Sequence, residues 1–126
     1  MTTKKILVIE DEEGLREIIQ FSLEAVAGWD VIGAASGSEG IAIAQTEQPD
    51  AILLDVMMPD MDGIATFEHL QANPLTEHIP TIFVTAKARN SEQQQFIDLG
   101  IAGLITKPIK AQDLVEQIQG ILNWQG

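Results

Sequence analysis

Short apolar runs alternate with longer amphipathic stretches along the whole chain, and this alternation constrains the fold more than any other feature. The runs at residues 6–9 and 51–54 are apolar throughout, which is typical of strands buried on both faces. Strands of this kind form parallel sheets whose two faces are covered by helices. The sequence therefore predicts an α/β fold, a doubly wound parallel sheet of five strands with five helices.

The breaks between runs give the expected elements. We expect strands over residues 6–9, 30–35, 51–54, 81–84 and 101–106. We expect helices over residues 12–27, 38–47, 63–72 and 111–124, and a short fourth helix that is capped by Ser91 and ended by Gly100. Either Ser36 or Ser38 could cap the second helix. The first helix has one apolar face, made of Leu15, Ile18, Ile19, Leu23 and Val26.

Composition narrows the class of protein. The chain has 126 residues and a net charge of −12, and no stretch approaches the roughly 20 apolar residues of a membrane span. So acidic a surface repels nucleic acid and anionic lipid. Without cysteine there is no disulfide, thiolate metal site or thiol nucleophile. We therefore expect one soluble, cytoplasmic domain that contacts neither nucleic acid nor membrane directly.

Polar side chains follow four of the five predicted strands. Glu10 and Asp11 follow the first, Asp55 the third, Thr85 the fourth and Lys107 the fifth. Ligands of an open parallel sheet bind beyond the carboxyl ends of its strands, so these side chains should converge. Taken singly, each has a plainer interpretation as a turn, cap or surface residue. Their convergence favours a functional site.

The chemistry of this set suits phosphoryl transfer. Crowded carboxylates repel one another, and a hard divalent cation such as Mg²⁺ relieves the repulsion. An aspartate can act as a nucleophile that forms an aspartyl phosphate. Phosphoryl transfer mainly needs positioning and charge neutralisation, which a metal ion and Lys107 would supply. The set contains every group needed to move a phosphoryl group onto a carboxylate.

Four segments together resemble the receiver domains of two-component response regulators. They are ILVIEDE at residues 6–12, ILLD at 52–55 with MMP at 57–59 and DG at 62–63, VTA at 84–86, and TKP at 106–108. The resemblance covers essentially the whole chain, residues 1–126, as one receiver domain without an output domain. It implies the flavodoxin-like strand order 2-1-3-4-5, which the pattern alone does not give.

The resemblance also implies roles for the residues at the strand ends. Asp55 is the expected phosphoacceptor, Asp11 a direct ligand of Mg²⁺ (or of Mn²⁺ in its place), and Glu10 a ligand through water. The backbone carbonyl of Met57 is expected to complete the protein ligands.

Three further roles follow from the same resemblance. Lys107 is expected to pair with the phosphoryl oxygens, ahead of a cis peptide bond to Pro108. Thr85 is expected to move its hydroxyl towards the phosphoryl group, which the backbone N–H of Ala86 also reaches.

The implied function is a switch in a phosphorelay. A sensor histidine kinase or phosphotransfer protein would phosphorylate Asp55, and an unknown downstream protein would read a surface made by strand 4, helix 4, strand 5 and helix 5. We expect a monomer or a weak homodimer. Leu104 stands where many relatives carry Tyr or Phe, so the aromatic readout is missing. Met57 and Lys87 occupy flanking positions that tune phosphoryl lifetime in the family.

Other functions fit the sequence less well. A small Mg²⁺-dependent phosphohydrolase resembling the haloacid-dehalogenase group would carry a second Asp where Met57 stands. A degenerate receiver, used only for interaction, would not need the full acidic and lysine set. Flavin binding would need a hydroxyl- and glycine-rich loop after the first strand, where this chain is acidic. We therefore expect a signalling protein that takes part in its own phosphoryl transfer, and not an enzyme with a separate substrate.

Overall fold

The structure is a computed structural model that describes residues 3–58, 62–86 and 89–124. Within these residues strands and helices alternate along the chain. The strands are β1 (Lys5–Ile9), β2 (Asp30–Ala34), β3 (Ala51–Asp55), β4 (Thr81–Thr85) and β5 (Gly103–Thr106). The helices are α1 (Glu13–Ala27), α2 (Gly37–Glu47), α3 (Gly63–Ala72), α4 (Asn90–Asp98) and α5 (Ala111–Leu122).

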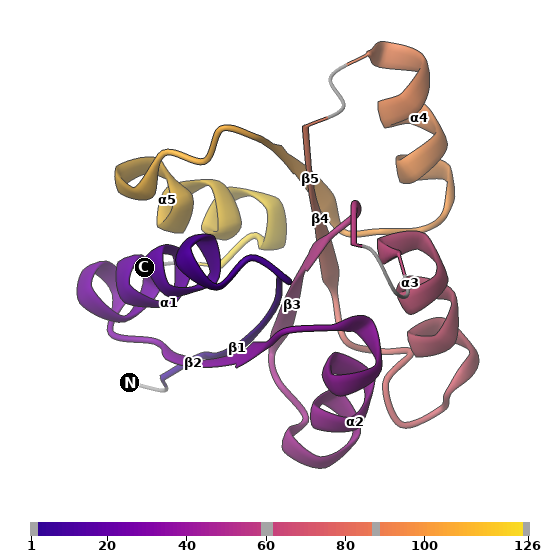
Figure 1. The fold of residues 1–126 in the computed structure, drawn as a ribbon, viewed down its shortest axis with the longest axis horizontal. Helices are drawn as coiled ribbons and strands as arrows, with labels where there is room; N and C mark the ends of the chain where they lie inside the picture. The colour runs from indigo at the N-terminus through magenta and orange to yellow at the C-terminus, as the bar shows by residue number, and fades with distance from the viewer. Residues whose placement is uncertain (1–2, 59–61, 87–88, 125–126) are drawn as a thin grey trace.

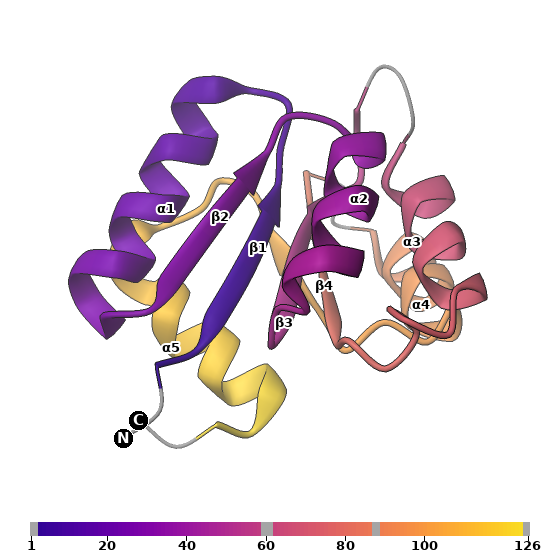
Figure 2. The ribbon, with the colours of Figure 1, turned by 90° about the horizontal axis from the view of Figure 1, so that it is seen from below.

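The strands form one sheet in the order β2-β1-β3-β4-β5, and every neighbouring pair is parallel. Helices α1 and α5 cover one face of the sheet, and α2, α3 and α4 cover the other (Figure 1). Figure 2 shows the same two layers from below, with α1 and α5 on one side of the sheet and α2, α3 and α4 on the other. The predicted fold class and strand order are confirmed.

The alternation of side chains along each strand builds two cores. In β1, Ile6 and Val8 point into the core shared with α1 and α5, and Leu7 and Ile9 point into the core shared with α2, α3 and α4. Both sets are at most 1% exposed. This is why the β1 run is apolar at every position.

Two helix starts show which capping predictions hold. Ser36, not Ser38, caps α2, because its hydroxyl accepts a hydrogen bond from the N–H of Glu39 at 3.2 Å. The prediction for Ser91 is wrong. Arg89 occupies the N-cap position of α4, and its carbonyl accepts the N–H of Gln93 at 3.0 Å, so Ser91 lies inside the first turn.

Two element ends differ from the prediction. Strand β5 begins at Gly103, two residues later than expected, because Gly100 has a φ of 98° and turns the chain before it joins β4. Helix α5 ends at Leu122 because Asn123 takes the left-handed conformation, with a φ of 59°. Neither difference moves the carboxyl ends of the strands.

The apolar face predicted for α1 is only partly buried. Ile19 and Leu23 are at most 1% exposed, whereas Ile18 is 54% and Val26 is 62% exposed. Helical spacing tells which residues share a side, but the width of the buried strip depends on how α1 lies on the sheet and against α5. Among the helices of the described residues, none has the length and apolar content needed to cross a bilayer.

Candidate functional site

The carboxyl ends of β1 and β3 bring three carboxylates together. Asp55 is the last residue of β3, and Glu10 directly follows β1, whose Ile9 pairs with Leu54. Asp55 is 3% and Glu10 is 2% exposed, while Asp11 is exposed. One carboxylate oxygen from each of the three lies within 4.8 Å of the other two. The three carboxylates that the sequence predicted to converge therefore lie together in the structure.

Lys107 reaches this group from the end of β5. Its Nζ lies 3.3 Å from Oδ1 of Asp55 and 3.6 Å from Oε1 of Glu10. Its backbone N–H donates to the carbonyl of Thr85 at 2.8 Å, and the following bond to Pro108 is cis, as predicted. In the sheet, β4 lies between β3, which ends at Asp55, and β5, which precedes Lys107. The last residue of β4 is Thr85, which is fully buried.

The charged groups of this site shift one another's pKa values. Burial raises the pKa of Glu10 to about 7, and the nearby charge of Asp55 adds to the rise. The N–H of Glu12, which donates to Oε2 of Glu10 at 3.2 Å, and the charge of Lys107 act in the opposite direction. Burial alone would lower the pKa of Lys107, but the charges of Asp55 and Glu10 outweigh it and raise that pKa.

The donor set fits a hard divalent cation. Oε1 of Glu10 is buried and has no hydrogen-bond partner among the described residues, although Lys107 lies 3.6 Å away. A buried oxygen of this kind is costly unless a cation or donor reaches it. All three side chains offer oxygen, which Mg²⁺ prefers over nitrogen or sulfur. Glu10, Asp11 and Asp55 would therefore hold such an ion.

The other predicted site residues take positions around Asp55. The N–H of Met57 donates to Oδ1 of Asp55 at 3.3 Å, and the Met57 side chain is 59% exposed. The role of the Met57 carbonyl as a metal ligand stays a prediction. Ala86 directly follows β4 and is exposed. Lys87 lies outside the described residues, as does Pro59 of the loop after Asp55.

Gly63 positions the peptide that follows Asp55, a role that the sequence did not predict. A Cβ on Gly63 would lie 2.5 Å from Cα of Val56 and 2.6 Å from the carbonyl oxygen of Asp55. The N–H of Gly63 donates to the carbonyl of Val56 at 2.9 Å. Asp62 caps α3 by accepting from the N–H of Ala65 at 2.8 Å. The start of α3 is thus packed directly against the backbone after Asp55.

Arg16 is a second residue that the sequence did not single out. Its Nη1 donates to the carbonyl of Glu10 at 2.8 Å. That carbonyl belongs to the peptide joining Glu10 to Asp11, so Arg16 fixes the backbone that carries both carboxylates. The missing Cβ of Gly33 makes room, because a Cβ there would lie 3.1 Å from Cδ of Arg16. A glycine inside a short strand was the available signal.

Comparison with known proteins assigns the family. The profile described as the response regulator receiver domain matches residues 6–119. The alkaline phosphatase synthesis transcriptional regulatory protein PhoP of Bacillus subtilis is 38% identical over 119 residues, which cover 94% of this chain and 48% of that protein. The phosphate regulon transcriptional regulatory protein PhoB of Pseudomonas aeruginosa is 35% identical over 126 residues, 100% of this chain and 55% of that protein.

The fold is also similar to solved structures of receiver proteins. The chemotaxis protein CheY4 of Vibrio cholerae superposes with a TM-score of 0.88 at 27% identity, covering 95% of this chain and 99% of that chain. The chain spans about half the length of the curated relatives described above. Both relatives are transcriptional regulatory proteins by name. The chain belongs to the family of response regulator receiver domains, the receiving modules of two-component signalling.

Proposed function

We propose that this chain is a phosphorylation switch that accepts a phosphoryl group on Asp55 from a histidine kinase or a phosphotransfer protein. One observation carries the proposal: Nζ of Lys107 lies 3.3 Å from Oδ1 of the nearly buried Asp55, beside two further carboxylates. A half-buried lysine next to a buried nucleophilic carboxylate is the arrangement that neutralises an incoming phosphoryl group.

The reaction follows from these groups. An oxygen of Asp55 forms a bond to phosphorus, and the bond from phosphorus to the histidine nitrogen of the donor breaks. The bonding electron pair stays on the histidine, and the product is an acyl phosphate. Lys107 pairs with the phosphoryl oxygens. Asp11, Asp55 and the carbonyl of Met57, with Glu10 through water, would hold Mg²⁺, which would supply further charge neutralisation. Attack of water on the acyl phosphate would reset the switch, so the chain acts on itself and not on a separate substrate.

The readout is proposed to run through Thr85. Its hydroxyl gains a strong acceptor when the phosphoryl group arrives, and its displacement biases the packing of β4, α4, β5 and α5. On that surface Ile97 is 50% and Leu99 is 39% exposed. Leu104 is half-buried against the core under α4, where it offers no aromatic ring to rotate. A partner would therefore read a shift of α4 and not a ring position.

Intact mass measurement tests the phosphoacceptor. The protein is incubated with Mg²⁺ and acetyl phosphate, beside the Asp55→Asn variant. We expect the wild type to gain one phosphoryl group that is stable in acid and labile in base, and the variant to gain none. Steady release of phosphate from simple esters would favour a hydrolase instead. Absence of both adduct and turnover, with Mg²⁺ binding confirmed, would leave only an interaction domain.

Backbone NMR tests the readout. We expect phosphorylation to shift the signals of α4 and β5 as well as those around Asp55, because Thr85 connects the two regions. In the Thr85→Ala variant the phosphoryl group should still be accepted, but the shifts in α4 and β5 should be lost. Shifts confined to the loop after Asp55 in the wild type would contradict this route.

A further inference from the structure

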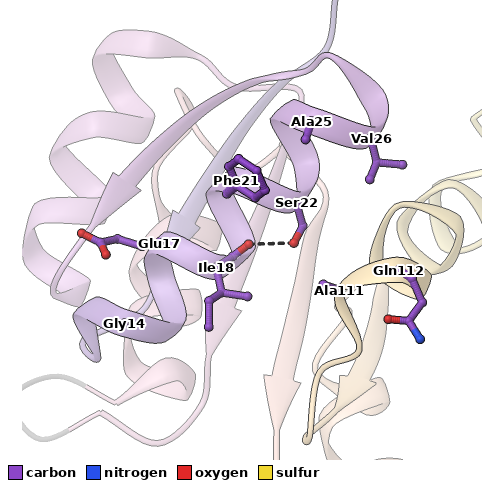
Figure 3. Close-up of a pocket in the computed structure, with 9 residues that line it drawn as sticks. All are labelled: Gly14, Glu17, Ile18, Phe21, Ser22, Ala25, Val26, Ala111 and Gln112. Atoms are coloured by element: carbon purple, nitrogen blue, oxygen red, sulfur yellow. Dashed lines mark hydrogen bonds between the residues drawn. The ribbon is translucent and has the colours of Figure 1, made fainter.

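Helix α4, all of whose residues the structure describes, is held to the fold by one buried side chain. Phe96 is its single buried residue, whereas each of the other four described helices has three or four. In α1, for example, Ile19, Ser22 and Leu23 are all buried. The Ser22 hydroxyl donates to the carbonyl of Ile18 at 2.7 Å, so its polar group is bonded within the helix (Figure 3). Helix α4 is therefore the least firmly anchored of the five.

The ring of Phe96 packs against Phe83, in the middle of β4. The two ring centroids are 5.5 Å apart and the ring planes are inclined at 67°, an edge-to-face contact. Phe83 is fully buried, and it makes a second contact of this kind with Phe67 of α3, at 5.5 Å and 87°. Because interiors are close-packed, Phe83 cannot shift without moving the ring of one helix or the other.

Strand β4 connects Phe83 to the phosphorylation site. Thr85 lies two residues further along the strand, about 6.6 Å away, and side chains at this spacing point to the same face of the sheet. Thr85 is fully buried, and its neighbour Val84 pairs with Asp55 of β3. A displacement of Thr85 towards a phosphoryl group on Asp55 therefore acts on the packed row of side chains that contains Phe83.

Of the two helices that contact Phe83, α4 is the one that yields. Helix α3 has four buried residues, and its Gly63 lies against the backbone after Asp55, so α3 is fixed at both places. Helix α4 has only Phe96. After α4 the chain turns at Gly100, where an added Cβ would meet nothing within 4 Å, so no other element wedges that turn. A tilt of α4 about Phe96 thus disturbs less packing than a movement of α3.

No other aromatic ring can carry the displacement out of β4. The register partner of Phe83 in β5 is Leu104, which is half-buried and has no ring. Beyond Thr85 the chain contains two aromatic residues, Phe96 and Trp124. The ring of Trp124 packs at 5.5 Å on Trp29, in the core on the opposite face of the sheet. The aromatic contact next to β4 is therefore supplied by the helix and not by β5.

We infer that Phe96 is the anchor of α4 and a positioning residue of the switch, whose contact with Phe83 converts the displacement of Thr85 into a tilt of α4. Ile97 directly follows Phe96 and is 50% exposed, and Leu99 is 39% exposed. A tilt about Phe96 changes how these two side chains are presented at the surface. This inference rests on the proposed function.

The test removes one ring at a time from the two contacts of Phe83. Phe96→Leu keeps an apolar side chain but shortens it, and Phe96→Ala removes the anchor altogether. Phe67→Leu is the matched control, because it removes a ring at the same 5.5 Å from Phe83 on a helix that keeps three other buried residues. Circular dichroism checks folding, and Phe96→Leu keeps the test valid if Phe96→Ala does not fold.

Amide hydrogen exchange measures the anchor without phosphorylation. In both Phe96 variants we expect the protection of the α4 amides to fall at least tenfold relative to that of the β3 amides, because the helix opens locally once its only buried contact is lost. In Phe67→Leu the same ratio should stay within threefold of the wild type. An unchanged ratio in the Phe96 variants would show that α4 is held by other contacts and would overturn the inference.

Backbone NMR with Mg²⁺ and excess acetyl phosphate measures the coupling, with intact mass confirming that each protein is labelled to the same extent. We expect Phe96→Leu to keep the signal shifts around Asp55 but to retain less than a third of the wild-type shifts in α4. Phe67→Leu should retain at least two thirds of them. This difference separates a conducting contact from a general loosening of the core.

Two other patterns would contradict the coupling. Full α4 shifts in Phe96→Leu would mean that the displacement bypasses Phe96, and an equal loss in Phe67→Leu would mean that any disturbance of Phe83 suffices. A wild type that takes no phosphoryl group, or takes one without any shift in α4, would instead defeat the proposed function or its readout. The exchange measurement would still decide whether Phe96 anchors α4, so the two failures are distinguishable.

Discussion

At the scale of residues, Glu10 is a buried carboxylate whose charge the fold does not fully neutralise. Its side chain is 2% exposed, its pKa is raised to about 7, and its Oε1 has no hydrogen-bond partner within the described ranges. A carboxylate in this position is stable when protonated or when a cation neutralises it. Glu10 therefore links the stability of the domain to pH and to metal.

The pH dependence of stability tests this link in metal-free protein. An acid whose pKa rises from 4.5 to about 7 on folding holds its proton more tightly in the folded state. Its stabilising contribution is complete below pH 4.5, falls as the pH rises towards 7 and is constant above, a change on the order of 3 kcal/mol. We expect the free energy of unfolding in urea and EDTA to fall between pH 5 and 8, relative to Glu10→Gln. Parallel curves for the two proteins would contradict the raised pKa.

Gly63 gives a second prediction at this scale. Gly63→Ala places a methyl group 2.5–2.6 Å from backbone atoms of Asp55 and Val56, which cannot rotate away. We expect a loss of about 1–3 kcal/mol in the free energy of unfolding and slower labelling by acetyl phosphate. The matched control is Gly120→Ala in α5, where a Cβ has no neighbour within 4 Å and should stabilise the helix by roughly 0.5–1 kcal/mol. A Gly63→Ala variant as stable and as rapidly labelled as the wild type would refute the close approach.

At the scale of elements, α1 carries two apolar stripes, one buried against the sheet and one exposed. Ile19 and Leu23 hold it to the sheet, and Ile18 and Phe21 face outward on the neighbouring side. A helix of 15 residues has room for both stripes because successive residues are turned by about 100°. The buried stripe stabilises the fold, and the other stripe stays exposed on the surface.

Truncation of single side chains in α1 separates the two stripes. Leu23→Ala should cost about 2–5 kcal/mol in the free energy of unfolding, because Leu23 is fully buried and leaves a cavity. Ile18→Ala should change stability by no more than about 0.5 kcal/mol, because that side chain is 54% exposed. Chemical denaturation followed by circular dichroism measures both. A similar loss in the two variants would mean that Ile18 is buried.

At the scale of the whole molecule, the net charge is −12, so the binding of a cation stabilises the folded state. Three of the carboxylates are held within 4.8 Å of one another by two strand ends, so their repulsion is built into the folded state. An ion that binds there stabilises the folded chain by mass action, while the unfolded chain offers no such group.

Thermal unfolding at constant ionic strength tests the metal site. Mg²⁺ at 100 times its dissociation constant should stabilise the protein by about 2.7 kcal/mol and raise the midpoint. Asp11→Asn should lose this response while folding normally, because Asp11 is exposed. Glu24→Gln, which removes an exposed carboxylate in α1, should keep it. Equal responses in the two variants would show general screening and not a site.

Much of the molecule follows from local backbone geometry, and so the sequence determined it. Side chains alternate along a strand and recur every 3.6 residues along a helix, so apolar runs identify the parallel strands and their connecting helices. The carboxyl ends of parallel strands meet at one edge. That rule was sufficient to predict, from positions in the sequence, that the residues at the strand ends lie near one another. They are Glu10, Asp11, Asp55, Thr85 and Lys107. The strand order came from resemblance to a family and not from any pattern.

Tertiary packing decided what depends on distances between remote segments. Helical spacing predicted that Ile18 and Ile19 share one apolar face of α1, but the seating of the helix on the sheet exposes Ile18 and buries Ile19. The raised pKa of Glu10 needs its burial and the nearness of Asp55, and the role of Gly63 needs α3 to touch the backbone after β3. Neighbours in sequence are fixed by the chain, whereas burial, charge coupling and close approach arise only when separate elements pack together.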